Sequence, residues 1–426
     1  MKNKSLLNLN KKVLIVSSWA PPKIGGAQNL YNVFSNINYG DYAILTSSKN
    51  FDGENGKFGT KLECNYYFYD SKVENSETST KETKKKYYYL IKKFPFIFKI
   101  LKNIFSFLKF FVFNLKLINK INKDGAKIVK DKKIDLLIGL SNVETNLFST
   151  FILSKKTDKP YVIYLFDLYY GNQLSFPYNI LAKFTEPIIF RNAKHILVTN
   201  DATKDYYIKK YRNEEKYSII YNCVSPDVYV LNFPETQKNT AHKTNIVFTG
   251  NIYWAQESAL NNLLNFASQT KLNLNVTIYC PNPPLNLVDK YKNIDNIKFT
   301  SASQSEMPKI QSEADILFLP LSWNTEAPDI IKTASPGKLT DYLIAGRPIL
   351  IHAPDYSFIA QYAKENNFAE VVDKEDSNLL ENAIQRLTED KEYSDKLVEN
   401  AKKTFYKNHN AYTNAEKITN IINNLL

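Results

Sequence analysis

Short apolar runs alternate with amphipathic stretches along most of the chain. In the first half the apolar runs predict β-strands at Val13–Ser17, Tyr42–Thr46, Leu136–Leu140, Tyr161–Phe166 and Ile196–Thr199. Stretches with helical periodicity lie between them, at Ala27–Ile37, Val143–Ser154, Pro177–Arg191 and Thr203–Tyr211. This alternation is typical of βαβ units, so we expect a parallel sheet.

The pattern restarts after a polar stretch, Phe233–Thr244, that reads as a linker. The next strands are predicted at Ile246–Thr249, Leu274–Tyr279, Ile297–Thr300, Ile316–Leu319 and Pro348–Ile351. A chain of 426 residues suits two domains of ordinary size. We therefore expect two α/β, Rossmann-like domains facing each other across a cleft. The expected division is residues 1–240, residues 241–410, and a C-terminal helix at residues 411–426 that can pack back on the first domain.

Ligands of open α/β sheets bind beyond the carboxyl ends of the strands, so the loops after the strands are the places to search. The first such loop holds Gly25 and Gly26 directly before a predicted helix. Backbone N–H groups and the helix dipole can meet an anion there, although a tight turn that needs positive φ explains the glycines equally well. No third glycine completes a dinucleotide fingerprint.

The second loop follows Ile246–Thr249 and contains Gly250, Asn251 and, as the next helix begins, Gln256. The two side-chain amides can donate hydrogen bonds to phosphate oxygens without carrying charge. An Asn turn with a polar cap is the alternative.

The third loop is the segment SPGKLTDYLIAGRPILI, in which Pro336 and Gly337 lead into Lys338 and Asp341 on a helix. A lysine at a helix N-terminus works against the macrodipole, which indicates an anionic neighbour. That neighbour is either a bound ligand or a local ion pair with Asp341.

The three loops together resemble those of GT-B glycosyltransferases of the large retaining family four. PPKIGGAQNLYNVF is similar to the glycine-rich first loop of that family, FTGNIYWAQESALNNLL to the opening of its second domain, and SPGKLTDYLIAGRPILI to its donor-binding helix. The resemblance extends over nearly the whole chain in the right order. It is nearest to transferases that build capsule and O-antigen repeat units, which implies a hexosyltransferase-type enzyme that retains anomeric configuration.

The resemblance also implies roles for individual residues. Gly25 and Gly26 would approach the transferred sugar and the diphosphate. Asp167 stands where the family often has a histidine after the strand, and it either replaces that histidine as a catalytic residue or is structural. The donor, a UDP- or GDP-linked sugar, would bind at Pro336, Gly337, Lys338, Leu339 and Asp341, with Lys338 on the diphosphate and Asp341 on the ribose. Asn251 and Gln256 replace a common Arg and Lys, and Thr333 replaces the first of two glutamates spaced eight apart.

Charge and reactive residues narrow the function further. The net charge is +12, and the segment Lys81–Lys133 alone holds sixteen lysines against three acidic residues, with no arginine. A nucleic-acid binder would use arginine in such a segment, so we expect no nucleic-acid partner. Four scattered histidines and the lack of an Asp-x-Asp motif predict that no metal is needed. Three unpaired cysteines and no signal-peptide pattern indicate the cytoplasm.

The lysine-rich segment has a helical stripe. Lys102, Lys109 and Lys116 recur every seven residues, with Lys99 nearby, and eight phenylalanines lie between Phe94 and Phe113, among them Phe107, Phe110 and Phe111. We interpret it as a pair of helices in the headgroup region of an anionic bilayer, on the inner face of the plasma membrane. A core helix with a solvated lysine edge is the alternative. A membrane surface fits a glycan acceptor linked to polyprenyl diphosphate.

Two other functions stay open from the residues. A nucleotide-sugar 2-epimerase of the same fold would need carboxylates and histidines in the cleft and no membrane face. A catalytically weak scaffold subunit would explain the replaced Arg, Lys and Glu positions.

Overall fold

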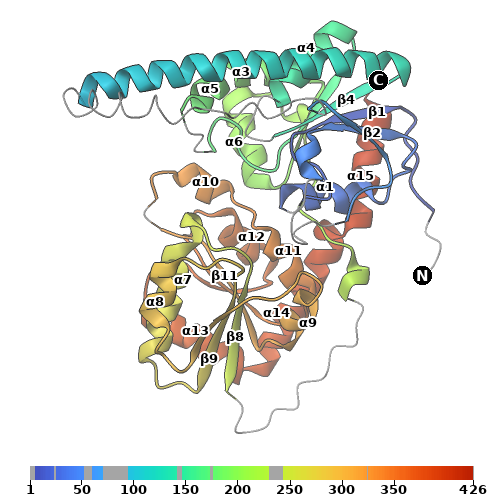
Figure 1. The fold of residues 1–426 in the computed structure, drawn as a ribbon. Coiled ribbons are helices and arrows are strands. Elements are labelled where there is room, and N and C mark those ends of the chain that lie inside the picture. The colour runs from blue at the N-terminus through green and yellow to red at the C-terminus, as the bar shows by residue number, and fades with distance from the viewer. Residues whose placement is uncertain are drawn as a thin grey trace.

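The computed structural model describes residues 5–23, 25–51, 60–70, 95–141, 146–172, 176–229, 243–323 and 325–425, without the side chains of residues 50, 95–111 and 113. Two α/β domains lie one above the other, each built on a parallel sheet (Figure 1). The fold class predicted from the sequence is therefore confirmed.

The first domain has a seven-stranded sheet in the order β3-β2-β1-β4-β5-β6-β7. Its strands are β1 (Val13–Val16), β2 (Tyr42–Thr46), β3 (Asn65–Phe68), β4 (Leu136–Leu140), β5 (Tyr161–Tyr164), β6 (His195–Val198) and β7 (Tyr217–Ile219). Its helices are α1 (Gly26–Phe34), α3 (Pro95–Asp131), α4 (Asn146–Thr157), α5 (Tyr178–Asn192) and α6 (Asp201–Tyr211). The strand order reverses between β1 and β4, so the loop after β1 opens at the switch point where such sheets bind ligands.

The second domain has a six-stranded sheet in the order β10-β9-β8-β11-β12-β13. Its strands are β8 (Thr244–Thr249), β9 (Leu274–Tyr279), β10 (Ile297–Thr300), β11 (Ile316–Pro320), β12 (Ile349–His352) and β13 (Glu370–Val372). Its helices are α7 (Trp254–Gln269), α8 (Leu285–Tyr291), α9 (Met307–Glu313), α10 (Pro328–Thr333), α11 (Gly337–Ile344), α12 (Phe358–Asn366), α13 (Ser377–Glu389) and α14 (Lys391–Thr404). Here the switch point lies between β8 and β11.

The lysine-rich segment forms one continuous helix, α3, rather than the expected helix pair. Pro95 occupies its first position, where a missing N–H costs nothing. Gly125 lies within this helix without breaking it. A Cβ at this position would lie 2.7 Å from Leu153 of α4, so the glycine lets the two helices approach closely. Ile121 and Ile128 are buried in the core, while Val112 and Leu115 are exposed.

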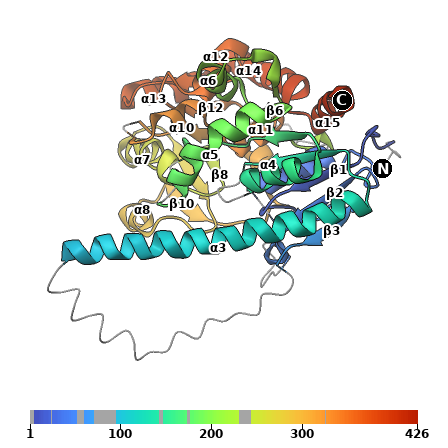
Figure 2. The same ribbon diagram turned by 90° about the horizontal axis from the view of Figure 1, so that it is seen from above.

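Helices α3, α4 and α5 form one layer on the first sheet, with α4 between the other two (Figure 2). None of the helices within the described ranges is long and apolar enough to cross a bilayer.

The chain returns to the first domain at its C-terminal end. After α14 a π-helical turn, Phe405–His409, leads into α15 (Ala411–Asn424), which packs against α1. Ala411, Ile418 and Ile422 of α15 are fully buried in the core beside β1.

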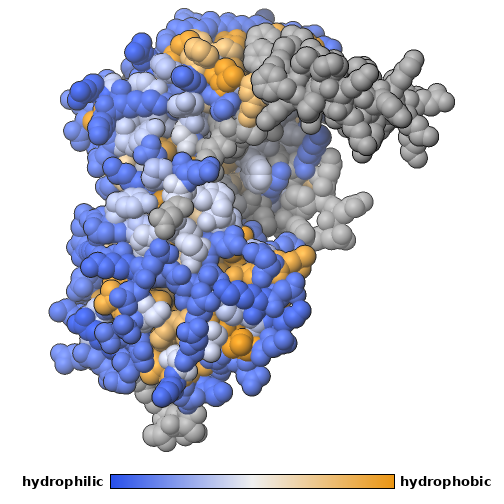
Figure 3. Space-filling view, turned by 90° about the vertical axis from the view of Figure 1, so that its left-hand side faces the viewer, coloured by the Kyte–Doolittle hydropathy of each residue, from blue (hydrophilic) through white to orange (hydrophobic). Residues whose placement is uncertain are grey.

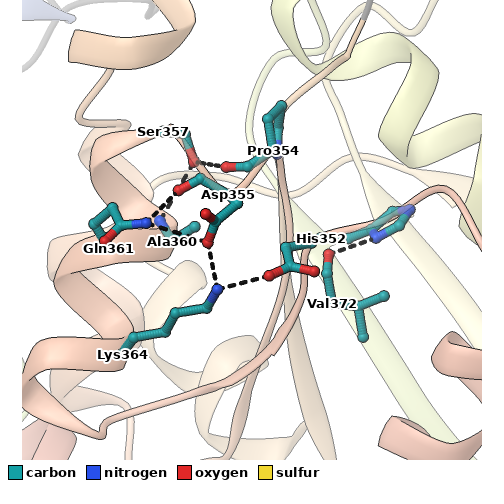
Figure 4. A network of polar contacts seen from close by, with 9 residues as sticks. His352, Pro354, Asp355, Ser357, Ala360, Gln361, Lys364 and Val372 are labelled. Atoms are coloured by element: carbon teal, nitrogen blue, oxygen red, sulfur yellow. Dashed lines mark hydrogen bonds and ion pairs between the residues drawn. The ribbon is translucent and has the colours of Figure 1, made fainter.

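The connection from β12 to α12 is held by short polar contacts (Figure 4). Ser357 caps α12 by accepting a hydrogen bond from the Ala360 N–H, and its hydroxyl donates to the Pro354 carbonyl. Lys364 forms ion pairs with Asp355 and Asp373. The His352 ring bonds the Val372 carbonyl at 3.0 Å, which ties β12 to the loop end of β13.

Candidate active site

The second-domain half of the site is built where β8 ends. Gly250 has φ of +103°, a conformation that favours glycine, and it turns the chain toward α7. A Cβ on Gly250 would lie 3.3 Å from Cε of Lys338, so the glycine makes room for the lysine stem. Lys338 Nζ lies 3.9 Å from the centre of the Phe248 ring and donates to Gln256 Oε1 at 3.3 Å. The structure thus brings Lys338 and Gln256 together.

Burial makes the charged form of the Lys338 amine unfavourable. Burial lowers its pKa to about 7. Lys338 forms no ion pair with any described residue, and the alternative of a local ion pair with Asp341 is therefore not realised. The amine also lies in the first turn of α11, where the helix dipole is positive. A bound anion would therefore stabilise the charged amine at this position.

Space for an anion exists at the start of α11. Nothing lies within 4 Å of a Cβ built on Gly337, so its backbone faces an open region. Pro336 is the N-cap residue and offers no side-chain cap, which leaves the first N–H groups of α11 to another acceptor. The Ser335 hydroxyl is enclosed and has no hydrogen-bond partner among the described residues. Leu339, in contrast, is buried in the core and anchors the helix.

Asp341 lies one turn after Lys338. Burial raises the pKa of its carboxyl to about 6, while a hydrogen bond with the Tyr229 hydroxyl lowers it in part. Asn251 is exposed at the end of β8. Thr333 is buried, and its hydroxyl donates to the Asp329 carbonyl within α10, so it faces its own helix.

The first-domain half of the site lies after β1 and β5. Gly25 has φ of +91° and open space where a Cβ would stand, whereas a Cβ built on Gly26, the first residue of α1, would lie 3.3 Å from the Phe166 ring. The predicted positive φ therefore applies to Gly25. Asp167 reaches solvent, yet protein surrounds it and the loss of hydration raises the pKa of its carboxyl. Burial raises the pKa of Tyr253 of the second domain to about 12, and the charge of Asp167 adds to this effect, so the two residues are near enough to interact electrostatically.

Hydrogen bonds join the two halves through a residue that sequence reasoning missed. Asn222 hydrogen-bonds Asn29 of α1 and donates to the Ser335 carbonyl at 2.8 Å. Its own carbonyl accepts from Thr340 of α11 at 3.2 Å and contacts His409 Nδ1 at 2.7 Å. Asn200 of the first domain also donates to the Thr333 carbonyl. The glycine-rich loop and the Lys338 loop are therefore held on opposite sides of one junction.

The remaining predicted residues fall elsewhere. Lys116 is exposed on α3. Lys99, Lys102, Lys109, Phe107, Phe110 and Phe111 lie on the backbone of α3, and their side chains are outside the described part. Within the described ranges no group of three or more His, Cys, Asp or Glu could hold a metal ion.

Comparison with known proteins agrees with this arrangement. Residues 281–404 match the family Glycosyl transferases group 1. No curated protein sequence matches the chain. A glycosyltransferase from Rickettsia africae has a similar structure, with a TM-score of 0.66, 13% identity, and coverage of 98% of this chain and 99% of that one. Anabaena HepE in complex with UDP-glucose gives a TM-score of 0.64 at 12% identity, with 97% and 99% covered. WaaG, a glycosyltransferase involved in lipopolysaccharide biosynthesis, gives 0.58 at 16%, with 97% and 100% covered.

The fold and the family match define the class of this protein. It is a glycosyltransferase with the GT-B fold, and the matched segment includes the loop and helix that carry Lys338.

Proposed function

We propose that the protein transfers a sugar, with retention of anomeric configuration, from a UDP- or GDP-linked donor to a glycan carried on polyprenyl diphosphate. Lys338 carries this proposal. It is a partly buried lysine without an acidic partner, at the start of a helix with open space before it. A leaving diphosphate gains negative charge as the glycosidic bond breaks, and such a cation stabilises that charge in the transition state.

The other residues of the site have matching roles in the proposal. Gln256 and Asn251 offer neutral amides to the phosphates, and Asp341 accepts from the ribose hydroxyls. Gly25 leaves room for the sugar from the first-domain side, and Asp167 meets the acceptor hydroxyl there. Residues 241–410 would bind the donor and residues 1–240 the acceptor. HepE, a structural neighbour, binds UDP-glucose, which favours UDP as the first nucleotide to test.

A membrane-bound acceptor is supported by the outer face of the first domain. Ile180, Phe184 and Ile188 follow one another at four-residue spacing on α5, and all are exposed, Phe184 to 68%. Val112 and Leu115 are exposed on α3, which flanks α4 on the other side. Figure 3 shows apolar side chains gathered at the top of the first domain. Exposed apolar side chains on α5 and on the lysine-rich helix α3 fit the headgroup region of an anionic bilayer, so the proposed location of the enzyme is the inner face of the plasma membrane.

The same face and the resemblance of the three loops support a proposed role in a surface-polysaccharide pathway of the family-four kind, for capsule or O-antigen repeat units. WaaG, another structural neighbour, takes part in lipopolysaccharide biosynthesis.

The experiment is a thermal-shift panel with UDP, GDP, ADP and CMP. A nucleotide that binds only the folded state raises the Tm by mass action. We expect UDP or GDP to raise the Tm and the Lys338→Met variant to lose most of that shift. A panel in which no nucleoside diphosphate stabilises the protein would contradict the proposal.

A further inference from the structure

The second domain carries a groove outside the site described above. Its volume is 760 Å³, and it lies between α7, α8 and the loop after β11. One wall is the face of α7 that presents Trp254, Glu257 and Asn261; Asn286 of α8 and Trp323 of the loop stand opposite. Figure 1 shows α7 and α8 at the side of the second domain, below the junction with the first.

One end of this groove lies close to a pocket between the domains. Glu326 lines the groove and also lines this pocket of 530 Å³, whose other wall is formed by Tyr170 and Tyr206 of the first domain. The groove and the pocket between the domains therefore meet at Glu326.

Two indole rings and Leu287 line the groove, and its other lining residues are polar. Trp254 is 41% exposed. Trp323 packs on the His352 ring, with centroids 4.6 Å apart. Burial lowers the pKa of His352 to about 4, so the ring is neutral, and its two nitrogens bond the Val372 carbonyl and Asn262. The support of Trp323 is thus fixed in orientation, as Figure 4 shows for the His352–Val372 contact.

The polar groups of the groove are also held in place. Asn261 Oδ1 accepts from Lys290 Nζ at 3.0 Å and from the Tyr291 hydroxyl at 2.8 Å, which fixes the amide and leaves its Nδ2 without a hydrogen bond to any described residue. Glu257 Oε1 accepts from Asn286 Nδ2 at 3.1 Å. The Ser258 hydroxyl is enclosed and has no partner in the described part of the chain.

We propose that this groove binds the sugar chain of the acceptor, as a neutral oligosaccharide of several hexose units. The proposal rests on the proposed function and extends it to the class of acceptor: residues 1–240 hold the reacting end of the acceptor, and the groove of the second domain holds units farther along its sugar chain. The flat C–H faces of hexose rings pack on exposed indoles, while amide and carboxylate groups bind the hydroxyls at the ring edges. A phosphate-rich ligand fits poorly, because Glu257 and Glu326 are acidic and Lys290, the single basic residue among the lining residues, already bonds Asn261.

Tryptophan fluorescence tests the groove directly, since the chain has three tryptophans and two of them line it. The Trp19→Phe protein would be titrated with maltohexaose, cellohexaose, laminarihexaose and hexa-N-acetylchitohexaose, and with the matching disaccharides. We expect at least one hexasaccharide to shift the emission and to bind about tenfold or more tighter than its disaccharide, because the longer chain contacts both indoles.

Variants locate the binding. Trp254→Ala and Asn261→Ala should each weaken hexasaccharide binding by about fivefold or more. Tyr356→Ala, which removes an exposed aromatic ring of the second domain outside the groove, should not. Equal Tm values for the three variants would show that each is folded.

Two results would overturn the inference: no hexasaccharide changes the emission, or Trp254→Ala and Asn261→Ala bind as Trp19→Phe does. UDP and GDP thermal shifts on the same proteins separate this failure from that of the proposed function. A protein that binds nucleotide and no hexasaccharide keeps the transferase site and lacks the glycan groove, whereas one that binds neither fails both.

Discussion

Replacing Lys338 with methionine tests the donor site most sharply. Methionine keeps an unbranched apolar stem beside Phe248 and Gly250 but removes the amine. A hydrogen bond from a charged donor to phosphate contributes about 1.5–3 kcal/mol, so we expect UDP to bind about tenfold to a hundredfold more weakly to Lys338→Met at pH 6. Uridine has no phosphate to contact, so its binding should change little. Isothermal titration calorimetry measures both.

The pKa of Lys338 also predicts the direction in which UDP affinity changes with pH. Burial places the pKa of the Lys338 amine at about 7 in the free protein, so the amine is charged below this pH and neutral above it. Diphosphate binds the charged form and raises its pKa. UDP affinity of the wild type should therefore be highest at low pH and fall about tenfold per pH unit above 7, until the pKa of the bound state is reached.

The nucleotide itself titrates in the opposite direction. The second ionisation of a terminal phosphate lies near pH 6, at about the value for phosphorylated side chains, and gives UDP more negative charge as the pH rises. Lys338→Met should thus show a flat or slightly rising affinity over the range in which the wild type loses it. The difference between the two profiles isolates the lysine.

Stability without ligand supplies an independent check. The unfolded chain binds the Lys338 proton up to a pKa of about 10.4, whereas the folded protein releases it near 7. The cost of the buried charge is therefore fully present below pH 7 and disappears as the pH rises toward the unfolded value. Lys338→Met should raise the Tm most below pH 7 and progressively less above it.

Lys332→Met is the matched control, because Lys332 is an exposed lysine on α10 close to the site. It should leave UDP affinity and its pH profile unchanged. If Lys338→Met binds UDP as the wild type does at pH 6, or loses uridine and UDP to the same extent, the lysine is structural and the donor site lies elsewhere.

Three further predictions follow from other parts of the structure. Asn222→Ala removes side-chain hydrogen bonds to Asn29 and Ser335 and should lower the free energy of unfolding by about 1–3 kcal/mol in urea titrations. Transfer activity should fall more than UDP affinity, and an unchanged activity would contradict the role of this junction. Phe184→Ser should weaken sedimentation with anionic liposomes at unchanged Tm. The control is Leu285→Ser, which changes a side chain of the second domain that is 79% exposed and should not weaken sedimentation. Equal effects of the two variants would refute a membrane face on α5. EDTA should leave turnover intact, and loss of activity restored by Mg²⁺ or Mn²⁺ would show that a metal is required.

Most strands could be predicted because their apolar runs are buried on both faces of a parallel sheet. Strands β2, β4, β9 and β10 begin and end at the predicted residues. The strands that the sequence analysis missed are β3, β7 and β13, and each lies at an edge of its sheet. They are three or four residues long and only partly buried, so they carry few apolar positions. The four-residue edge strand β10 was predicted nevertheless, because its apolar residues Ile297 and Phe299 alternate with polar ones.

The helix pair expected in the lysine-rich segment was wrong for a related reason. Phe and Ile cover most of the helix surface between Phe94 and Phe113, so the periodicity does not reveal where one helix would end. The close approach of Leu153 of α4 explains why a glycine stands inside the helix at position 125. That contact joins residues far apart in the sequence and cannot be read from local pattern.

The same limit separates the predicted from the unpredicted part of the site. Lys338 stood out because a charge at a helix N-terminus is unfavourable without a partner. The identity of its neighbour, Gln256, depends on how the start of α7 lies against α11. The neighbour is a neutral amide, and this has a consequence for function. A carboxylate at position 256 would hold Lys338 charged but would also repel the diphosphate. An amide oxygen positions the amine and leaves its positive charge for the ligand, so the free energy stored in the unpaired charge is released when the diphosphate binds.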